Sequence, residues 1–134
     1  MTIYQKGMKY KEEVKYDREL YLKEGKIHMN KRYRQGVMFE YEVRDWLKER
    51  GWIVVRSAGS KTAIDLVAVR NNQTLLVQCK KGTRPPKQER VNMSILEGKT
   101  GKSIQVLLAY KPKYGRNIEW YSMREEGKLT RIYI

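Results

Sequence analysis

Residues 64–80 read IDLVAVRNNQTLLVQCK, and this stretch decides the fold. Two apolar runs rich in β-branched residues flank Asn71 and Asn72. Asparagine tolerates the positive φ that a two-residue type I′ turn requires. The stretch therefore predicts two antiparallel strands, 64–70 and 73–80, joined by a tight turn.

The position of the turn sets the register of this hairpin. Counting back from an Asn-Asn turn pairs Asp65 with Gln78 across the two strands. A turn one residue later would instead pair Asp65 with Lys80. Because side chains alternate along a strand, Gln78 and Lys80 share one face in either case. A carboxylate, an amide and an amine are thus expected to meet at one end of the hairpin.

The flanking sequence predicts an α/β domain. Apolar residues with helical spacing, Phe39, Val43 and Leu47 among them, indicate a helix that Gly51 is placed to end. The strands 52–57, 64–70 and 73–80 form an antiparallel meander, and residues 58–63 form a loop of small residues. The predicted order is helix 36–50, this meander, helix 87–99, and strands 104–110, 118–123 and 129–134 in a mixed sheet.

A second carboxylate is expected beside the hairpin. Glu40, Val43 and Leu47 have the spacing of one helical face, so Glu40 continues the stripe that faces the sheet. Each polar residue has an ordinary explanation by itself, and only their joint placement points to a site. Carboxylate and amide oxygens gathered there suit Mg²⁺, and a divalent cation is therefore implied.

Charge and cysteine content narrow the class of protein. The chain has 134 residues, with 29 Lys and Arg against 15 Asp and Glu, a net charge of +14. Such an excess favours polyanion binding, and nucleic acid is the expected partner. A single cysteine, Cys79, excludes an intramolecular disulfide. With no long apolar segment and no signal-peptide pattern at the start, we expect an intracellular, cytoplasmic protein without a membrane anchor.

Two segments carry a family resemblance. Residues 34–69, RQGVMFEYEVRDWLKERGWIVVRSAGSKTAIDLVAV, precede VQCKKG at 77–82. The resemblance rests on the glycine four residues before Glu40, the RSAGS loop, the Asp65 strand and the strand that ends in lysine. In combination, over roughly residues 32–123, they resemble the archaeal-type Holliday junction resolvases of the PD-(D/E)xK nuclease superfamily.

The resemblance implies a restriction-endonuclease-like core, a homodimer with two active sites, and Mg²⁺-dependent cleavage of four-way DNA junctions in recombination and repair. Mn²⁺ is a possible substitute for Mg²⁺. By position, Glu40, Asp65 and Gln78 would hold the metal, and Lys80 would orient or activate water. Ser60 would be the loop serine near the scissile phosphate, and Ser57 is the second choice.

The sequence departs from the family pattern in two places. Gln78 stands where the family has glutamate, although its carbonyl oxygen can still bind Mg²⁺. Residues 1–30 match nothing in the family and are treated as an N-terminal extension of a single nuclease domain, 31–134. Two alternatives therefore remain: a weak or inactive branched-DNA-binding protein on the nuclease fold, and a nuclease of this fold with another DNA substrate.

Basic residues around the predicted site are expected to contact phosphates, which position DNA without reading its sequence. The three tryptophans, by their helix and strand settings, are assigned to the core or a dimer contact rather than to base stacking. The predicted DNA-binding residues are Lys31, Arg32, Arg34, Arg56, Lys61, Lys81, Arg84, Lys87 and Arg90.

Overall fold

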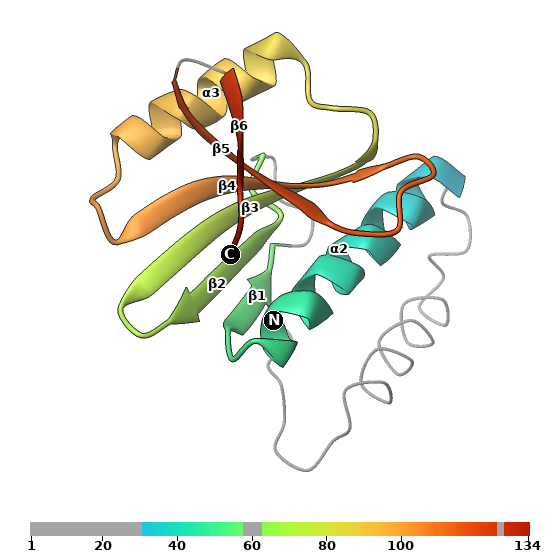
Figure 1. Cartoon of the computed structure of the whole chain (residues 1–134), viewed down its shortest axis with the longest axis horizontal. Helices are drawn as coiled ribbons and strands as arrows, with labels where there is room; N and C mark the ends of the chain where they lie inside the picture. The colour runs from blue at the N-terminus through green and yellow to red at the C-terminus, as the bar shows by residue number, and fades with distance from the viewer. Residues whose placement is uncertain (1–30, 58–62, 126–127) are drawn as a thin grey trace.

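The computed structural model describes residues 31–57, 63–125 and 128–134 (Figure 1). The predicted N-terminal extension, residues 1–30, lies outside them. All the predicted helices and strands are present, with boundaries shifted by up to five residues at the start of the first helix. In chain order the elements are α2 (Lys31–Glu49), β1 (Ile53–Arg56), β2 (Leu66–Arg70), β3 (Gln73–Gly82), α3 (Lys87–Gly98), β4 (Ile104–Pro112), β5 (Glu119–Glu125) and β6 (Lys128–Ile132).

The β2–β3 hairpin has the register that an Asn-Asn turn predicts. Asn71 and Asn72 have φ of 47° and 64°, the positive values of a type I′ turn. Leu66 pairs with Val77 at the far end of the ladder. Asp65 lies one residue beyond this pair, and because Arg70 pairs with Gln73 the alternative turn one residue later is excluded.

The sheet is mixed, as predicted, with the strand order β1-β2-β3-β4-β5-β6. Strands β1, β2 and β3 form an antiparallel meander. Strand β4 runs parallel to β3, and a parallel pair needs a crossover, which α3 supplies. Strands β5 and β6 then continue the sheet in antiparallel pairs. The α/β prediction with a three-stranded meander is confirmed.

Each face of the sheet is covered by a helix (Figure 1). Helix α2 buries Val43 and Leu47 in an apolar cluster on one face, and α3 buries Met93 in a second cluster. Successive residues of β4 alternate between the two, since Leu107 belongs to the first cluster and Leu108 to the second. Neither helix in the described ranges has the length and apolar composition needed to cross a bilayer.

Gly51 terminates α2, as predicted, two residues after the last helical residue, Glu49. Gly51 has a φ of 89°, which costs glycine little because it lacks a Cβ. The Trp52 N–H donates to the Leu47 carbonyl at 3.1 Å, and the Gly51 N–H donates to the Lys48 carbonyl at 3.0 Å. This pair of bonds is a Schellman motif, which satisfies carbonyls at the helix end.

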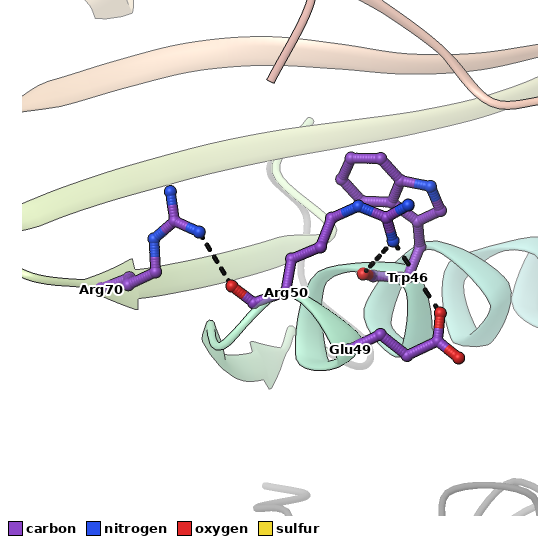
Figure 2. A network of polar contacts seen from close by, with 4 residues as sticks. All are labelled: Trp46, Glu49, Arg50 and Arg70. Carbon is purple, nitrogen blue, oxygen red and sulfur yellow. Dashed lines mark hydrogen bonds and ion pairs between the residues drawn. The ribbon is translucent and has the colours of Figure 1, made fainter.

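Figure 2 shows how this end of α2 is fixed to β2. Arg70 Nη1 donates to the Arg50 carbonyl at 2.8 Å, and Arg50 Nη1 donates to the Trp46 carbonyl at 3.0 Å. The Arg50 guanidinium also stacks 3.5 Å from the centroid of the Trp46 ring and lies 3.8 Å from a carboxylate oxygen of Glu49. The C-terminal end of α2 is therefore fixed beside Arg70, the last residue of β2.

The tryptophans belong to the core, in agreement with their sequence assignment. Trp52 and Trp120 are buried, and Trp46 packs against the same cluster. The rings of Trp46 and Trp120 lie 5.2 Å apart, in a tilted arrangement. These side chains fill the space between α2 and the sheet.

Candidate active site

The ladder between β2 and β3 ends at Asp65. Its N–H donates to the Val77 carbonyl, and its own carbonyl accepts from the Ser57 N–H, both at 2.8 Å. One step further, the Cys79 N–H donates to Asp65 Oδ2 at 2.8 Å instead of to a strand carbonyl. The Asp65 carboxylate therefore lies at the level of the sheet, where groups from both faces can approach it.

Glu40 approaches from the α2 side. Arg56, the last residue of β1, donates from Nε to Glu40 Oε1 at 3.0 Å. The side chain of Glu40 is only 16% exposed, and that of Arg56 is 13% exposed. The Arg56 guanidinium also lies 5.1 Å from the centroid of the Tyr41 ring. Arg56 is thus held within the site as the partner of a carboxylate.

The environment of Glu40 disfavours its ionised form. Burial, followed by the negative charge of Asp65, raises the pKa of Glu40 from 4.5 to about 7, although Arg56 opposes the change. Two carboxylates that repel each other in a partly buried site favour a bound cation, since it would stabilise both charges.

Gln78 and Lys80 face the opposite side, toward α3, whereas Val77 and Cys79 pack in the α2 cluster. Gln78 Nε2 donates to Glu89 Oε2 at 3.4 Å. Lys80 Nζ lies 3.5 Å from the same oxygen. The predicted alternation along β3 is confirmed, and a carboxylate from α3 joins the amide and the amine.

The other end of the Gln78 amide has no such contact. Gln78 is 3% exposed, and its Oε1 is buried without a hydrogen-bond partner within the described part of the chain. A buried carbonyl oxygen left unpaired is costly, so such an atom usually marks a place where a partner binds. A cation, or a water on its shell, is a fitting partner for this oxygen.

Asp65 connects the two sides of the site electrostatically. Burial raises its pKa, and the Cys79 N–H, Lys80 and Arg56 oppose that rise in decreasing order. The negative charge of Glu89 raises the pKa further. Groups from β1, β3 and α3 therefore all act on this one carboxylate, which in turn raises the pKa of Glu40 on α2.

A cation at this place would need more than protein carboxylates. No three Asp, Glu, His or Cys side chains of residues 31–57, 63–125 and 128–134 are grouped to hold a metal by themselves. Mg²⁺ commonly uses one or two carboxylates and completes its shell with water and substrate phosphates. Glu40 and Asp65 supply two carboxylates, and the Gln78 carbonyl oxygen is of a kind that Mg²⁺ also accepts.

The structure describes some of the remaining predicted residues and leaves others outside the described ranges. Ser60 and Lys61 lie outside the described residues, as does the side chain of Arg32. Arg84 lies 5.4 Å from the Tyr121 ring centroid, and its Nη2 donates to the Tyr121 hydroxyl at 3.4 Å. Arg90 is half-buried, and the exposed predicted residues are Lys31, Arg34, Lys81, Arg84 and Lys87.

Sequence reasoning missed Glu89. In the sequence it is an acidic residue in the first turn of a predicted helix, where it would serve the helix dipole. A signal was nevertheless present. Gln78 and Lys80 project from β3 on the face that the crossover helix must cover, and Glu89 follows Gln78 by only eleven residues. The first turn of that helix is thus a natural source of a further polar group.

The mixed sheet covered on both faces by helices, with polar groups where β2 and β3 separate, is a restriction-endonuclease-like arrangement. The solved structure of Archaeoglobus fulgidus Hjc, described as a Holliday junction resolvase, matches it with a TM-score of 0.54. That match has 19% sequence identity and covers 67% of this chain and 74% of that one.

The sequence comparisons identify the family. The family model of the archaeal Holliday junction resolvases (Hjc) matches residues 31–119, and the chain belongs to this family. The crossover junction endodeoxyribonuclease Hjc of Methanocaldococcus jannaschii is 41% identical over 56 residues, which are 42% of this chain and 41% of that protein. The matched part thus spans about two fifths of the length of this relative.

Proposed function

We propose that this protein is a structure-specific endodeoxyribonuclease that resolves four-way DNA junctions by metal-dependent phosphodiester hydrolysis. One observation supports the proposal most directly: Asp65 lies where the β2–β3 pairing ends and interacts with Glu40 on the α2 side and with Lys80, two residues after Gln78, on the α3 side, in a chain of the Hjc family. The net charge of +14 supports DNA as the substrate.

Each residue has a proposed role in this reaction. Glu40, Asp65 and the Gln78 carbonyl oxygen would hold Mg²⁺, with Mn²⁺ as a substitute. The cation, when bound, would stabilise negative charge on the phosphate as a Lewis acid. Lys80, an ammonium group near Asp65 and Glu89, would donate hydrogen bonds that orient the attacking water. The loop serine Ser60 is proposed to lie beside the scissile phosphate.

The proposed DNA contacts are the basic residues around this end of the sheet. Lys31 and Arg34 lie in the first turn of α2, and Lys81 and Lys87 lie at the end of β3 and the start of α3. Contacts of this kind bind the backbone and suit recognition of shape rather than sequence. Arg32, Arg56, Lys61, Arg84 and Arg90 complete the proposed set.

A cleavage assay tests the proposal. A labelled synthetic four-way junction and a linear duplex of the same sequence would be incubated with the protein in Mg²⁺, in Mn²⁺ and in EDTA. We expect paired, symmetric nicks in the junction alone, and only when a metal is present. Cleavage of the duplex at an equal rate would contradict junction specificity and indicate a nuclease with another substrate.

Gln78 favours a second candidate, a branched-DNA-binding protein without activity, because the amide removes a negative charge from the site. Tight junction binding without product in either metal would select this candidate.

A homodimer with two active sites forms part of the proposal, since paired nicks need two sites. Sedimentation equilibrium would test it, and a monomer on and off the junction would contradict it.

A further inference from the structure

We propose that Glu89 supplies, from α3, the negative charge that β3 lacks at Gln78, and that the two side chains act on the cation as a pair. In this pair the Glu89 carboxylate contributes the charge and holds the amide, and the Gln78 carbonyl oxygen faces the cation. The inference rests on the proposed metal dependence.

The hydrogen bond with Glu89 orients the Gln78 amide. A primary amide has a donor nitrogen and an acceptor oxygen at opposite sides of its end group. Gln78 Nε2 donates to Glu89 Oε2 at 3.4 Å, which fixes the direction of the side chain. Its Oε1 then points away from Glu89 and is buried, with no hydrogen-bond partner in the described ranges. The contact with Glu89 therefore leaves the carbonyl oxygen as the buried, unpaired end of the amide.

The charge of Glu89 favours a neutral side chain at position 78. A glutamate at position 78 would place its carboxylate against that of Glu89, and like charges at such a distance repel. A glutamine removes this repulsion and adds a donor that Glu89 accepts. The pair thus keeps a single negative charge but places it on the helix. This arrangement gives a physical reason for glutamine at the end of β3.

Glu89 is partly exposed and contacts Lys80 as well as Gln78. Its side chain is 41% exposed, so the charge is accessible from solvent, whereas Gln78 is buried. The same Oε2 lies 3.5 Å from Lys80 Nζ. Glu89 therefore contacts both residues of the strand that are proposed to act in cleavage, and its charge acts on Asp65. It is a positioning residue for the amide and the amine.

Metal binding by the free protein tests the pair without relying on cleavage. Mn²⁺ affinity would be measured by electron paramagnetic resonance titration of the wild type, Glu89→Gln, and the exchange variant Gln78→Glu/Glu89→Gln. We expect Glu89→Gln to weaken Mn²⁺ binding by about tenfold or more. The exchange variant should recover most of the loss, because it returns the carboxylate to the strand.

Glu97→Gln is the matched control. Glu97 lies on the same helix, about two turns further on, and its replacement removes the same charge. It should leave Mn²⁺ affinity unchanged. Circular dichroism and thermal melting would establish that each variant is folded. If Glu89→Gln does not fold, Gln78→Met, which removes both ends of the amide, should show the loss of affinity instead.

The outcomes separate this inference from the proposed function. Unchanged Mn²⁺ affinity in folded Glu89→Gln, or no saturable Mn²⁺ binding by the wild type, would overturn the inference even if junctions are cleaved. An exchange variant no better than Glu89→Gln would also overturn it. Conversely, the wild type could bind Mn²⁺ in a way that depends on Glu89 and yet cleave no junction. That result would overturn the proposed function and leave this inference standing.

Discussion

Asp65 is the residue on which the site depends, because it receives contributions from both faces of the sheet. Its carboxylate accepts the Cys79 N–H, lies within the field of Glu40, and is influenced by Lys80 and Glu89 from the other face. The Asp65 carboxylate therefore interacts with most of the charged groups of the proposed site. Small changes there should therefore affect chemistry more than folding or DNA affinity.

Asp65→Asn and Lys80→Ala should each lower junction cleavage by at least about 100-fold, because each removes a charge that we propose acts in cleavage, on the metal for Asp65 and on the attacking water for Lys80. Junction affinity should change only a few-fold, since binding comes chiefly from the basic surface. Single-turnover cleavage and electrophoretic mobility shift would measure the two effects. Lys102→Ala, in the turn before β4 at the opposite end of the sheet, is the control. Full activity in either site variant would refute the proposed site.

Glu40 should make the folded protein less stable as the pH rises. Its pKa is 4.5 ordinarily and about 7 in the folded chain without metal, because of burial and Asp65. Between these values the folded state binds more protons than the unfolded state. The free energy of unfolding should therefore fall as the pH rises from about 4.5 to about 7, by up to about 3 kcal/mol.

Urea unfolding in EDTA at about pH 5 and about pH 8 would measure this effect in the wild type and in Glu40→Gln, which cannot ionise at that position. The wild type should lose more stability than the variant over this interval. Parallel pH profiles would mean that Glu40 does not titrate in this range.

Among the elements, the β2–β3 hairpin has the greatest influence on the site. Its turn fixes the register, and the register places Leu66 opposite Val77, so that Asp65 and Gln78 are the adjoining residues of the two chains. A slip of one residue would move every side chain of one strand to the other face. The hairpin must therefore be rigid for the site to form, and the turn is where substitutions can test this.

Asn72→Val should lower the free energy of unfolding by about 1–2 kcal/mol, because a β-branched residue is strained at a φ of 64°. Asn72→Gly should be neutral or stabilising, since glycine suits the second position of a type I′ turn. Urea unfolding would measure both. Gln73→Val, the exposed residue that follows, controls for the change of side chain. Equal stability of the valine and glycine variants would contradict the assigned turn.

Helix α2 illustrates how an element carries a residue to the site. The helical stripe predicts that Glu40 faces the sheet, and the structure confirms this placement through its bond with Arg56. The predicted contact of Arg56 with DNA stays a prediction. Its pairing with Glu40 depends on how α2 lies against β1, which no local pattern in either segment specifies.

For the whole molecule, the net charge of +14 should dominate DNA affinity. The double variant Lys81→Ala/Lys87→Ala should weaken junction and duplex binding alike. It should also lower the slope of log affinity against log salt by about 0.9 for each phosphate that the protein no longer neutralises. Fluorescence anisotropy at several salt concentrations would measure this, with Lys102→Ala as the control. An unchanged slope would mean that these lysines do not bind phosphates.

The sequence by itself determined the elements, the turn and the faces of the strands, because periodicity and turn chemistry are local properties of the chain. It also indicated which polar residues belong together at the end of β3. Only the tertiary structure decided their partners: Arg56 with Glu40, and Glu89 with Gln78 and Lys80. Those contacts depend on how α2 and α3 pack on the two faces of the sheet. That packing results from the burial of many side chains at once and leaves no short pattern in the sequence.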